Sequence, residues 1–286
     1  MNISPLSNLT DCVFWACLLE ATAAKPGNVH RGADFEDLTY PDLIMAGQAI
    51  APVLAQSPSL PLGQAIHAAV AATRAAVNTN ANLGIILLLA PLCLVPRHQS
   101  LAEGISAVLD NLSPQDATLT YAAINLARPG GMGQVTQADL QAAPPQDLLA
   151  AMRFAAQYDS IARQYATNFH DLWHLVVPSL RQNLQRLPTL AAIVKTFVEV
   201  LAALPDTLIQ RKCGVATARH ASDWAAEVLA AAKDSDESYQ QALADWDFWL
   251  RSDGHRRNPG TTADLICAGL FVGLREGWLR PPFQWE

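Results

Sequence analysis

Apolar residues recur along most of the chain at the three-to-four-residue spacing of amphipathic helices, and convincing alternation of apolar and polar residues, which would indicate strands, is absent. The pattern predicts a first helix over Asn8–Ala24, a second from Tyr40 that ends before Pro58, and a third over Pro61–Val77. The segment Leu83–Leu94 is apolar on every side, which is typical of a helix enclosed by other helices. We therefore expect an all-α fold with Leu83–Leu94 near its centre.

Further helices are expected in the rest of the chain, with Pro or Gly at most of the junctions. The stretch from Arg128 to Pro145 is rich in Gly, Pro and Gln, so we expect a loop with a short helical turn at 136–142. The tail from Trp278 is expected to pack as an extended strap. Because no long linker and no repeat interrupts the chain, residues 1–286 are expected to form a single domain. The remaining helices are expected at 99–110, 114–127, 146–156, 157–186 with a break near Pro178, 188–203, 206–212, 215–233, 237–251 and 261–277.

Composition and charge narrow the class of protein. Hydrophobic residues make up 51% of the 286 residues, enough for a large packed core, and the net charge of −7 gives no global attraction to nucleic acid or to an anionic membrane. The five cysteines are odd in number and form no CxxC pair, which favours a reducing compartment. No secretory signal is evident, and the longest apolar run, Leu83–Val95, is too short to span a bilayer. We expect a soluble cytoplasmic protein, with a homodimer as an open alternative to a monomer.

The most polar junction is the turn Lys25-Pro26-Gly27-Asn28-Val29-His30-Arg31, which follows the first predicted helix. Pro26 cannot continue that helix, and Gly27 can adopt backbone angles closed to other residues. The turn therefore predicts that three cations lie together, with Glu20 before them and Asp34 after them. Such cations suit a phosphate chain, and the two carboxylates suit a divalent metal. The alternative interpretation is a capped helix end followed by a solvated loop.

Four other stretches combine amides, cations, glycines or acids, the glycine loop Arg128-Pro129-Gly130-Gly131-Met132-Gly133 among them, and each also has a purely structural interpretation. Asn is a good N-cap, cations at a helix C-terminus complement the helix dipole, and so do acids in a first turn. Asp159 and Arg163 similarly have the spacing of a surface salt bridge. Taken together, however, the junctions favour one convergent phosphate and metal site. Their residues are Asn80, Asn82 and Gly84 at the central helix, Asp206, Arg211 and Lys212 around a short helix, and Gly260, Thr261, Thr262 and Asp264 at the last helix.

In their order and combination, these motifs resemble those of the triphosphoribosyl-dephospho-CoA synthases, also called ATP:dephospho-CoA triphosphoribosyltransferases. The resemblance runs from Glu20 to Asp264, almost the whole chain. The chain has Asn82-Leu83 where members associated with citrate lyase carry His-Lys, so it resembles a divergent branch. The matching stretches are Lys25-Pro26-Gly27-Asn28-Val29-His30-Arg31, Asn80-Ala81-Asn82-Leu83-Gly84, Gly130-Gly131-Met132-Gly133, Asp206-Thr207 with Arg211-Lys212-Cys213-Gly214, and Pro259-Gly260-Thr261-Thr262-Ala263-Asp264-Leu265.

The resemblance implies an all-α enzyme that transfers the 5-triphosphoribosyl group of ATP to the 2′-hydroxyl of 3′-dephospho-CoA, or a related acceptor, and releases adenine. The product is the precursor of the prosthetic group of citrate lyase and malonate decarboxylase. Two other functions stay open: a helical phosphohydrolase that uses paired Mg²⁺ ions, and a nucleotide-binding protein without turnover. Adenine release distinguishes the transferase from both alternatives.

The expected roles follow from the charge of the substrates. A triphosphate requires Mg²⁺ and several cations, and carboxylates near ribose C1 stabilise an oxocarbenium-like transition state. We expect Glu20, Asp34 and Asp206 to be catalytic, and Glu20, Asp34, Asp206 and Asp264 to hold Mg²⁺. The expected phosphate-binding or substrate-binding residues are Lys25, Gly27, Asn28, His30, Arg31, Asn80, Asn82, Gly84, Arg211, Lys212, Gly260, Thr261 and Thr262.

Overall fold

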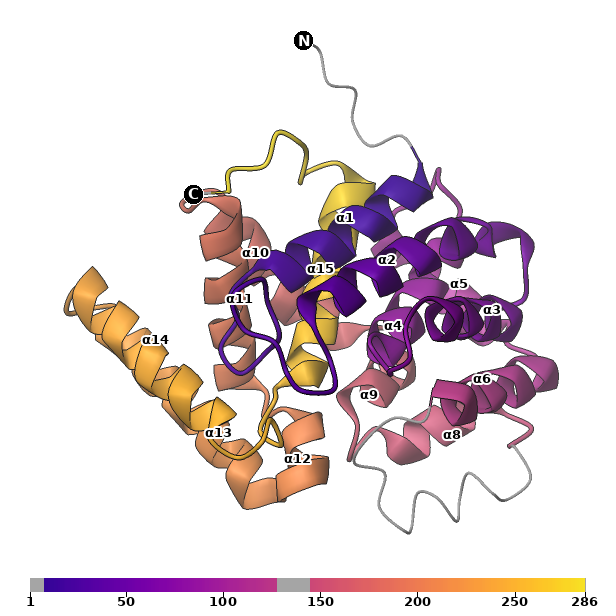
Figure 1. Cartoon of the computed structure of the whole chain (residues 1–286). Helices are drawn as coiled ribbons and strands as arrows, with labels where there is room; N and C mark the ends of the chain where they lie inside the picture. The colour runs from indigo at the N-terminus through magenta and orange to yellow at the C-terminus, as the bar shows by residue number, and fades with distance from the viewer. Residues whose placement is uncertain (1–7, 128–144, 286) are drawn as a thin grey trace.

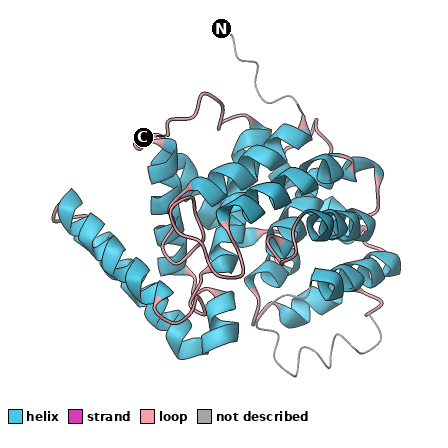
Figure 2. Cartoon of the chain, viewed as in Figure 1, coloured by secondary structure: helices cyan, strands magenta, loops and turns pink. Residues whose placement is uncertain are grey.

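The structure, a computed structural model, describes residues 8–127 and 145–285. Fourteen α-helices and no β-strand are found within these ranges, which confirms the expected all-α fold (Figure 2). A single isolated bridge between His30 and Ala33 is the nearest approach to sheet pairing in the described chain. The expected helical turn at 136–142 lies outside the described residues.

The helices follow one another with short connections, and Figure 1 shows how they are arranged. Their bounds are α1 (Leu9–Thr22), α2 (Tyr40–Ala55), η1 (Ser57–Ser59), α3 (Leu62–Ala76), α4 (Leu83–Leu94), α5 (Leu101–Asp110), α6 (Pro114–Ala127), α8 (Leu148–Ala155), α9 (Ser160–Ala166), η2 (Leu172–Val176), α10 (Val177–Leu184), α11 (Thr189–Ala203), α12 (Thr207–Cys213), α13 (Val215–Ala231), α14 (Asp236–Arg251) and α15 (Gly260–Glu276).

The helix predicted around Pro178 is the main correction to the expected boundaries. The chain breaks earlier, where Asn168 and Phe169 take left-handed φ angles of 52° and 63°. Beyond this break, the π-helix η2 leads directly into α10, so Pro178 falls in the first turn of α10. A proline is tolerated there because the first amide groups of a helix have no partner within it. The sequence signal was therefore correct for a helix start but wrong for a break.

The core lies between α4 and α15, with α1 and α2 packed over them in Figure 1. Nine consecutive residues of α4, Ile85–Cys93, are buried, and so are Leu265–Leu274 of α15. Burial of each large aliphatic side chain contributes about 1.5–3 kcal/mol, which explains why a helix without a polar face takes the centre. The prediction of Leu83–Leu94 as a central buried helix is confirmed to the residue.

The periphery is formed by α13, α14 and the tail. α14 packs against α13 at the edge of the molecule, and Trp246 is its fully buried anchor, with its ring centroid 6.5 Å from that of Phe197. The tail is extended, as expected: Phe283 stacks at 5.0 Å on Trp15, and the Gln284 carbonyl accepts a hydrogen bond of 2.7 Å from the Thr189 amide. Within the described residues, no helix has both the length and the apolar character that crossing a bilayer requires.

Candidate functional site

The turn after α1 is organised around a buried ion pair. The Lys25 side chain is completely buried, and its ammonium group lies 2.9 Å from Oε1 of Glu20. The same ammonium donates to the backbone carbonyls of Glu20 and Ala23. All three donors of an ammonium group are thereby used. Lys25, expected to bind a phosphate chain, neutralises Glu20 inside the protein in the structure, and its role toward a substrate stays a prediction.

The turn itself is fixed by the C-terminal part of α14. Gly27 has a φ of 74°, and its amide donates a hydrogen bond of 2.6 Å to Asp247. The Asn28 carbonyl accepts a hydrogen bond of 2.6 Å from Arg251, which also pairs with Asp247. The side-chain amide of Asn28 donates to Asn258. Gly27 and Asn28, expected to bind substrate, shape the turn in the structure, and their partners are not predictable from local spacing because they lie more than 200 positions away.

The residues beyond the turn are more exposed. His30 is partly buried, and its Nδ1 accepts a hydrogen bond of 3.2 Å from the Gly32 amide. Burial lowers the pKa of His30, and the nearby charges of Arg251 and Lys25 lower it further, so His30 is neutral at neutral pH rather than the expected cation. Arg31 and Asp34 are exposed. The Asp34 carboxylate accepts a hydrogen bond of 2.7 Å from the Tyr40 amide at the start of α2.

The start of α4 contains a buried amide group with an unused donor. Asn80 caps the helix loosely through a 3.3 Å hydrogen bond from the Leu83 amide, which is the structural role expected of one of these asparagines. Asn82 is 5% exposed, and its Oδ1 accepts a hydrogen bond of 2.9 Å from Thr73. Its Nδ2 has no hydrogen-bond partner among the described residues. A buried donor without a partner costs free energy, so this atom points to a ligand.

Gly84 and Asp264 meet where the first turn of α4 packs against the second turn of α15. A Cβ added at Gly84 would collide with Oδ2 of Asp264, so only glycine lets the carboxylate approach the α4 backbone this closely. Asp264 is partly buried and has neither a hydrogen-bond partner nor an ion-pair partner among the described residues. The two motifs, 180 positions apart, thus form one contact at the N-terminal ends of two long helices.

Asp206, by contrast, is fully engaged. It is 2% exposed, and its Oδ1 accepts hydrogen bonds from the amides of Leu208 and Ile209, which caps α12. Its Oδ2 accepts from the amide and the hydroxyl of Thr262 at 2.7 and 2.8 Å. Asp206 therefore joins the starts of α12 and α15. Its four hydrogen bonds are framework contacts, and the catalytic and metal-binding roles expected from the sequence stay predictions.

Asp159 also belongs to this region, although its spacing from Arg163 predicted a surface salt bridge. Its expected partner, Arg163, lies 2.7 Å from Asp171 instead. Asp159 caps α9 through the amides of two following residues, and its other oxygen lies 2.8 Å from Arg211. The start of α9 is further joined to α12 by a hydrogen bond of 3.1 Å from the Ser160 amide to Thr207. The local i,i+4 spacing gave no sign of an ion pair formed across 52 residues.

Four acids and one cation consequently share the space around the α15 N-terminus. Burial raises the pKa of Asp264 well above its usual range, and the neighbouring charges of Glu20, Asp206 and Asp159 raise it further. Arg211 acts in the opposite direction. Glu20, Asp159 and Asp206 each have a close partner, whereas the Asp264 carboxylate has none among the described residues. Asp264 is therefore the acid of this cluster that is available for chemistry.

Comparison with known proteins assigns the chain to a family. Residues 6–282 match the family of ATP:dephospho-CoA triphosphoribosyl transferases (CitG). The chain belongs to this family. A solved structure from Archaeoglobus fulgidus, provisionally described as a triphosphoribosyl-dephospho-CoA synthase, has the same fold, with a TM-score of 0.63 over 82% of this chain and 99% of that one at 22% identity. None of the curated proteins compared with the chain matches it.

Family membership confirms the resemblance drawn from the motifs. The described residues contain no group of three or more His, Cys, Asp or Glu side chains placed to hold a metal. Of the four expected ligands, Asp34 binds the Tyr40 amide, Asp206 is saturated and Glu20 pairs with Lys25. The four acids therefore do not fit one shared metal site. In a triphosphoribosyl transferase that uses ATP, Mg²⁺ can instead arrive with the triphosphate, which needs few protein ligands.

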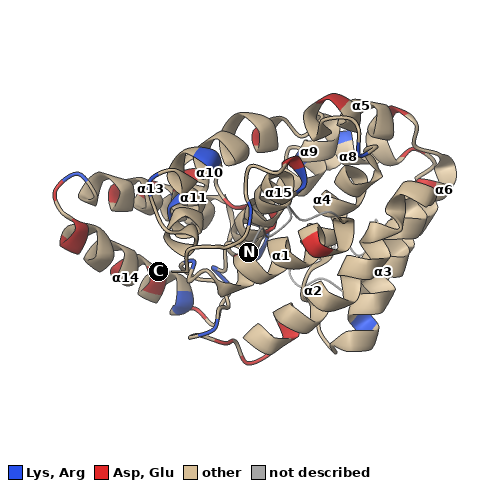
Figure 3. Ribbon diagram, turned by 90° about the horizontal axis from the view of Figure 1, so that it is seen from above, with Lys and Arg blue, Asp and Glu red and all other residues tan. Residues whose placement is uncertain are grey.

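The expected convergence of five cations is also only partly formed. Lys25 is enclosed, His30 is neutral, and Arg211 pairs with Asp159, which leaves Arg31 and Lys212 as cations without a close carboxylate in the described chain. Figure 3 shows that charged residues are scattered thinly over the ribbons of α1 to α4 and are more frequent on α14 and the connecting loops.

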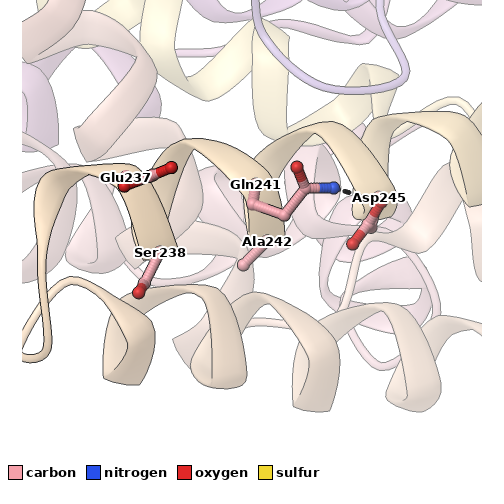
Figure 4. A pocket seen from close by; sticks show the side chains of 5 residues that line it. All are labelled: Glu237, Ser238, Gln241, Ala242 and Asp245. Atoms are coloured by element: carbon pink, nitrogen blue, oxygen red, sulfur yellow. Dashed lines mark hydrogen bonds between the residues drawn. The ribbon is translucent and has the colours of Figure 1, made fainter.

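Two hollows in the surface lie away from the Asp264 cluster. One lies along α14 and is lined by Glu237, Ser238, Gln241, Ala242 and Asp245 (Figure 4). Its lining contains two acids and no cation, and Gln241 donates a hydrogen bond of 2.9 Å to Asp245. Such a lining repels a phosphate chain, so this hollow is a poor match for the substrates of the family. The other hollow lies between α13 and the end of α14, and its lining includes two arginines, Arg256 and Arg257.

Proposed function

We propose that this chain transfers the triphosphoribosyl group of ATP to the 2′-hydroxyl of dephospho-CoA, or of a related acceptor, with release of adenine, and that the reaction takes place beside Asp264. Family membership supports the reaction class. The observation that carries the site is the contact of the Asp264 carboxylate with Gly84, at the meeting point of two helix N-termini. This arrangement joins a free carboxylate to a region that favours anions.

Asp264 has the properties of a group that carries a proton between the two substrates. When the bond between ribose C1 and adenine breaks, its electron pair leaves with adenine, which then needs a proton. The attacking hydroxyl loses one proton as its oxygen bonds to C1, so one carboxylate can take that proton and later deliver it. A raised pKa makes the Asp264 carboxylate a stronger base than an ordinary aspartate, which suits this role. Negative charge near C1 also stabilises positive charge that develops on the ribose.

The groups around Asp264 suit the donor. The unpartnered Nδ2 of Asn82 and the first turns of α4 and α15 favour phosphate oxygens, and Arg211 brings a positive charge from α12. Glu20, held by Lys25, supplies a fixed negative charge near Asp264.

Asn80, Gly260 and Thr261 border the same first turns, and Arg31 and Lys212 are the exposed or partly exposed cations available to a triphosphate. Mg²⁺ bound to ATP would neutralise much of the charge that enters.

Product analysis tests the proposal directly. The protein is incubated with Mg²⁺, ATP and dephospho-CoA, and the products are separated and identified by mass. Free adenine and an adduct of dephospho-CoA carrying a triphosphoribosyl group are expected. Release of phosphate or pyrophosphate without adenine would favour the phosphohydrolase, and saturable ATP binding without products would favour a binding protein.

The site is tested by Asp264→Asn. We expect kcat for adenine release to fall by a factor of about 10²–10⁴, because the proton carrier is lost while the side chain keeps its shape. The matched control is Asp236→Asn, which makes the same change in the first turn of α14, where the residue is exposed. Normal turnover by Asp264→Asn, at unchanged helical content, would contradict the assignment.

A further inference from the structure

The second hollow is built from the parts of an anion-binding pocket. It has a volume of about 370 Å³ and lies between α13 and the turn that follows α14. The side chains that matter in it are Thr217, His220, Trp249, Arg256 and Arg257. The first turn of α13 also lines it, and Gly214 provides no side-chain cap for the amide groups there. Cys213, which also lines the pocket, belongs to the Arg211-Lys212-Cys213-Gly214 stretch singled out in the sequence.

Both arginines are held in place without being tightly neutralised. Arg256 donates a hydrogen bond of 2.9 Å to the Lys212 carbonyl, and its side chain is 59% exposed. Arg257 donates to the Trp249 carbonyl at 2.8 Å. They share one carboxylate, Asp253, at 3.6 and 3.8 Å, distances longer than those of close charge-assisted hydrogen bonds. Two guanidinium groups with a single loosely placed acid leave positive charge available to a ligand.

The floor of the pocket is aromatic. The guanidinium carbon of Arg257 lies 4.4 Å from the centroid of the Trp249 ring, and His220 approaches the same ring edge-on at 5.0 Å. Trp224 supports Trp249 from α13 at 5.5 Å. A fixed tryptophan beside two arginines is an arrangement that recognises a phosphate attached to a planar base. The α14 hollow, with its two acids, has no such arrangement.

The pocket is connected to the proposed reaction site through two short links. The turn that carries Arg256 includes His255, whose φ is 52° and whose ring stacks at 4.2 Å on Phe35 from the loop after α1. On its other side the pocket includes Cys213, two residues after Arg211, which acts on the Asp264 carboxyl group.

We propose that this pocket binds the diphosphate of the acceptor nucleotide, dephospho-CoA, with Arg256 and Arg257 on the phosphates and Trp249 beside the base or the ribose. The assignment rests on the proposed function, which requires two anionic nucleotides to be held at once. The donor triphosphate is assigned to the first turns of α4 and α15, so the second cationic site is assigned to the acceptor. ATP carries the same chemical group, and the experiment must separate the two sources.

The test variant is Arg256→Gln, because Arg256 is exposed and its loss leaves the core untouched. Its matched control is Arg219→Gln, which removes the same charge from the exposed face of α13 next to His220 without lining the pocket. Adenine release is measured while dephospho-CoA and ATP are varied separately. We expect Arg256→Gln to raise the KM for dephospho-CoA about tenfold, with the KM for ATP and kcat within twofold of the parent. Arg219→Gln is expected to leave all three constants unchanged.

A larger rise in the KM for ATP than for dephospho-CoA would overturn the assignment, because the pocket would then serve the donor. Unchanged constants for both substrates would also overturn it. A binding measurement keeps the pocket testable if the parent releases no adenine and the proposed transfer is therefore wrong. Dephospho-CoA, ATP and inorganic pyrophosphate are titrated against the intrinsic tryptophan fluorescence of the parent and of Arg256→Gln. Weaker binding of dephospho-CoA to the variant supports the pocket, and equal binding of all three ligands to both proteins contradicts it.

Discussion

Asp206 at the start of α12 and Asp264 in the second turn of α15 both have a pKa that burial raises, yet their surroundings differ completely. Asp206 accepts four hydrogen bonds, two from its own helix and two from Thr262. Asp264 accepts none from the described residues and lies near three other acids. One carboxylate therefore contributes to the framework, while the other is held at a cost in free energy.

The difference separates the acids that stabilise the fold from the acid assigned to the reaction. Lys25 neutralises Glu20, Arg211 pairs with Asp159, and backbone donors satisfy Asp206, so three of the four acids are stable where they lie. The unfavourable electrostatic free energy of the cluster falls mainly on Asp264, and acids perturbed in this way are typical of functional sites. Mutations that separate stability from activity test this division of roles, and the three that follow are ordered by the size of the expected change in stability.

The largest change is expected from Lys25→Met. Removal of the ammonium group leaves Glu20 buried without its partner, so the free energy of unfolding should fall by about 3–5 kcal/mol. Urea denaturation followed by circular dichroism measures the change, with Lys233→Met, at an exposed position, as the control. Addition of Glu20→Gln to Lys25→Met should restore part of the loss. A loss below about 1 kcal/mol would mean that the pair is not held as described.

A smaller loss is expected from Asp206→Asn. The amide keeps one acceptor oxygen but turns an NH₂ group toward two donors, so about 2–3 kcal/mol should be lost from the free energy of unfolding. Asp147→Asn is the matched control: it also caps a helix, but one oxygen accepts its single capping bond at an exposed site. If Asp206→Asn were as stable as the parent and had lost only turnover, the catalytic role first expected for Asp206 would be correct.

The roles that could not be predicted from the sequence have one physical cause in common. The bounds of α4 followed from its composition, because a helix without a polar face can only be central. The roles of Lys25 and Asp206 depend instead on enclosure by helices from distant parts of the chain, which no local spacing encodes. Asp159 is the clearest case: the i,i+4 rule assigned it to Arg163, whereas the fold brings Arg211 to it.

The motifs nevertheless predicted which residues lie close together in the fold. Gly84 and Asp264 were singled out in separate junctions, and the fold brings them into contact. Helix starts rich in Asn, Thr, Gly and Asp are recognisable in sequence because capping demands those residue types. What the types do not reveal is which acid is left without a hydrogen-bond or ion-pair partner among the described residues. That property emerges only from the three-dimensional sum of neighbouring charges and burial.

The smallest change in stability, and one of opposite sign, is expected from Asp264→Asn. The folded-state pKa of Asp264 is raised above that of the unfolded chain, so the folded protein binds the proton more tightly. The contribution of this group to stability is fully present below the unfolded pKa and is lost as the pH rises through the raised folded pKa. At pH 8, well above the ordinary pKa of an aspartate, the parent therefore bears the free-energy cost of the raised folded pKa, and the asparagine variant does not.

We expect Asp264→Asn to melt roughly 2 °C or more above the parent at pH 8, and the gain to shrink as the pH is lowered toward the range in which Asp264 is protonated. Thermal unfolding across this pH range, with Asp206→Asn beside it, measures the contrast. Asp206→Asn should be less stable than the parent at pH 8, since an amide cannot accept its four hydrogen bonds. A lower melting temperature for Asp264→Asn at pH 8, or a difference that does not vary with pH, would place Asp264 in the framework with Asp206.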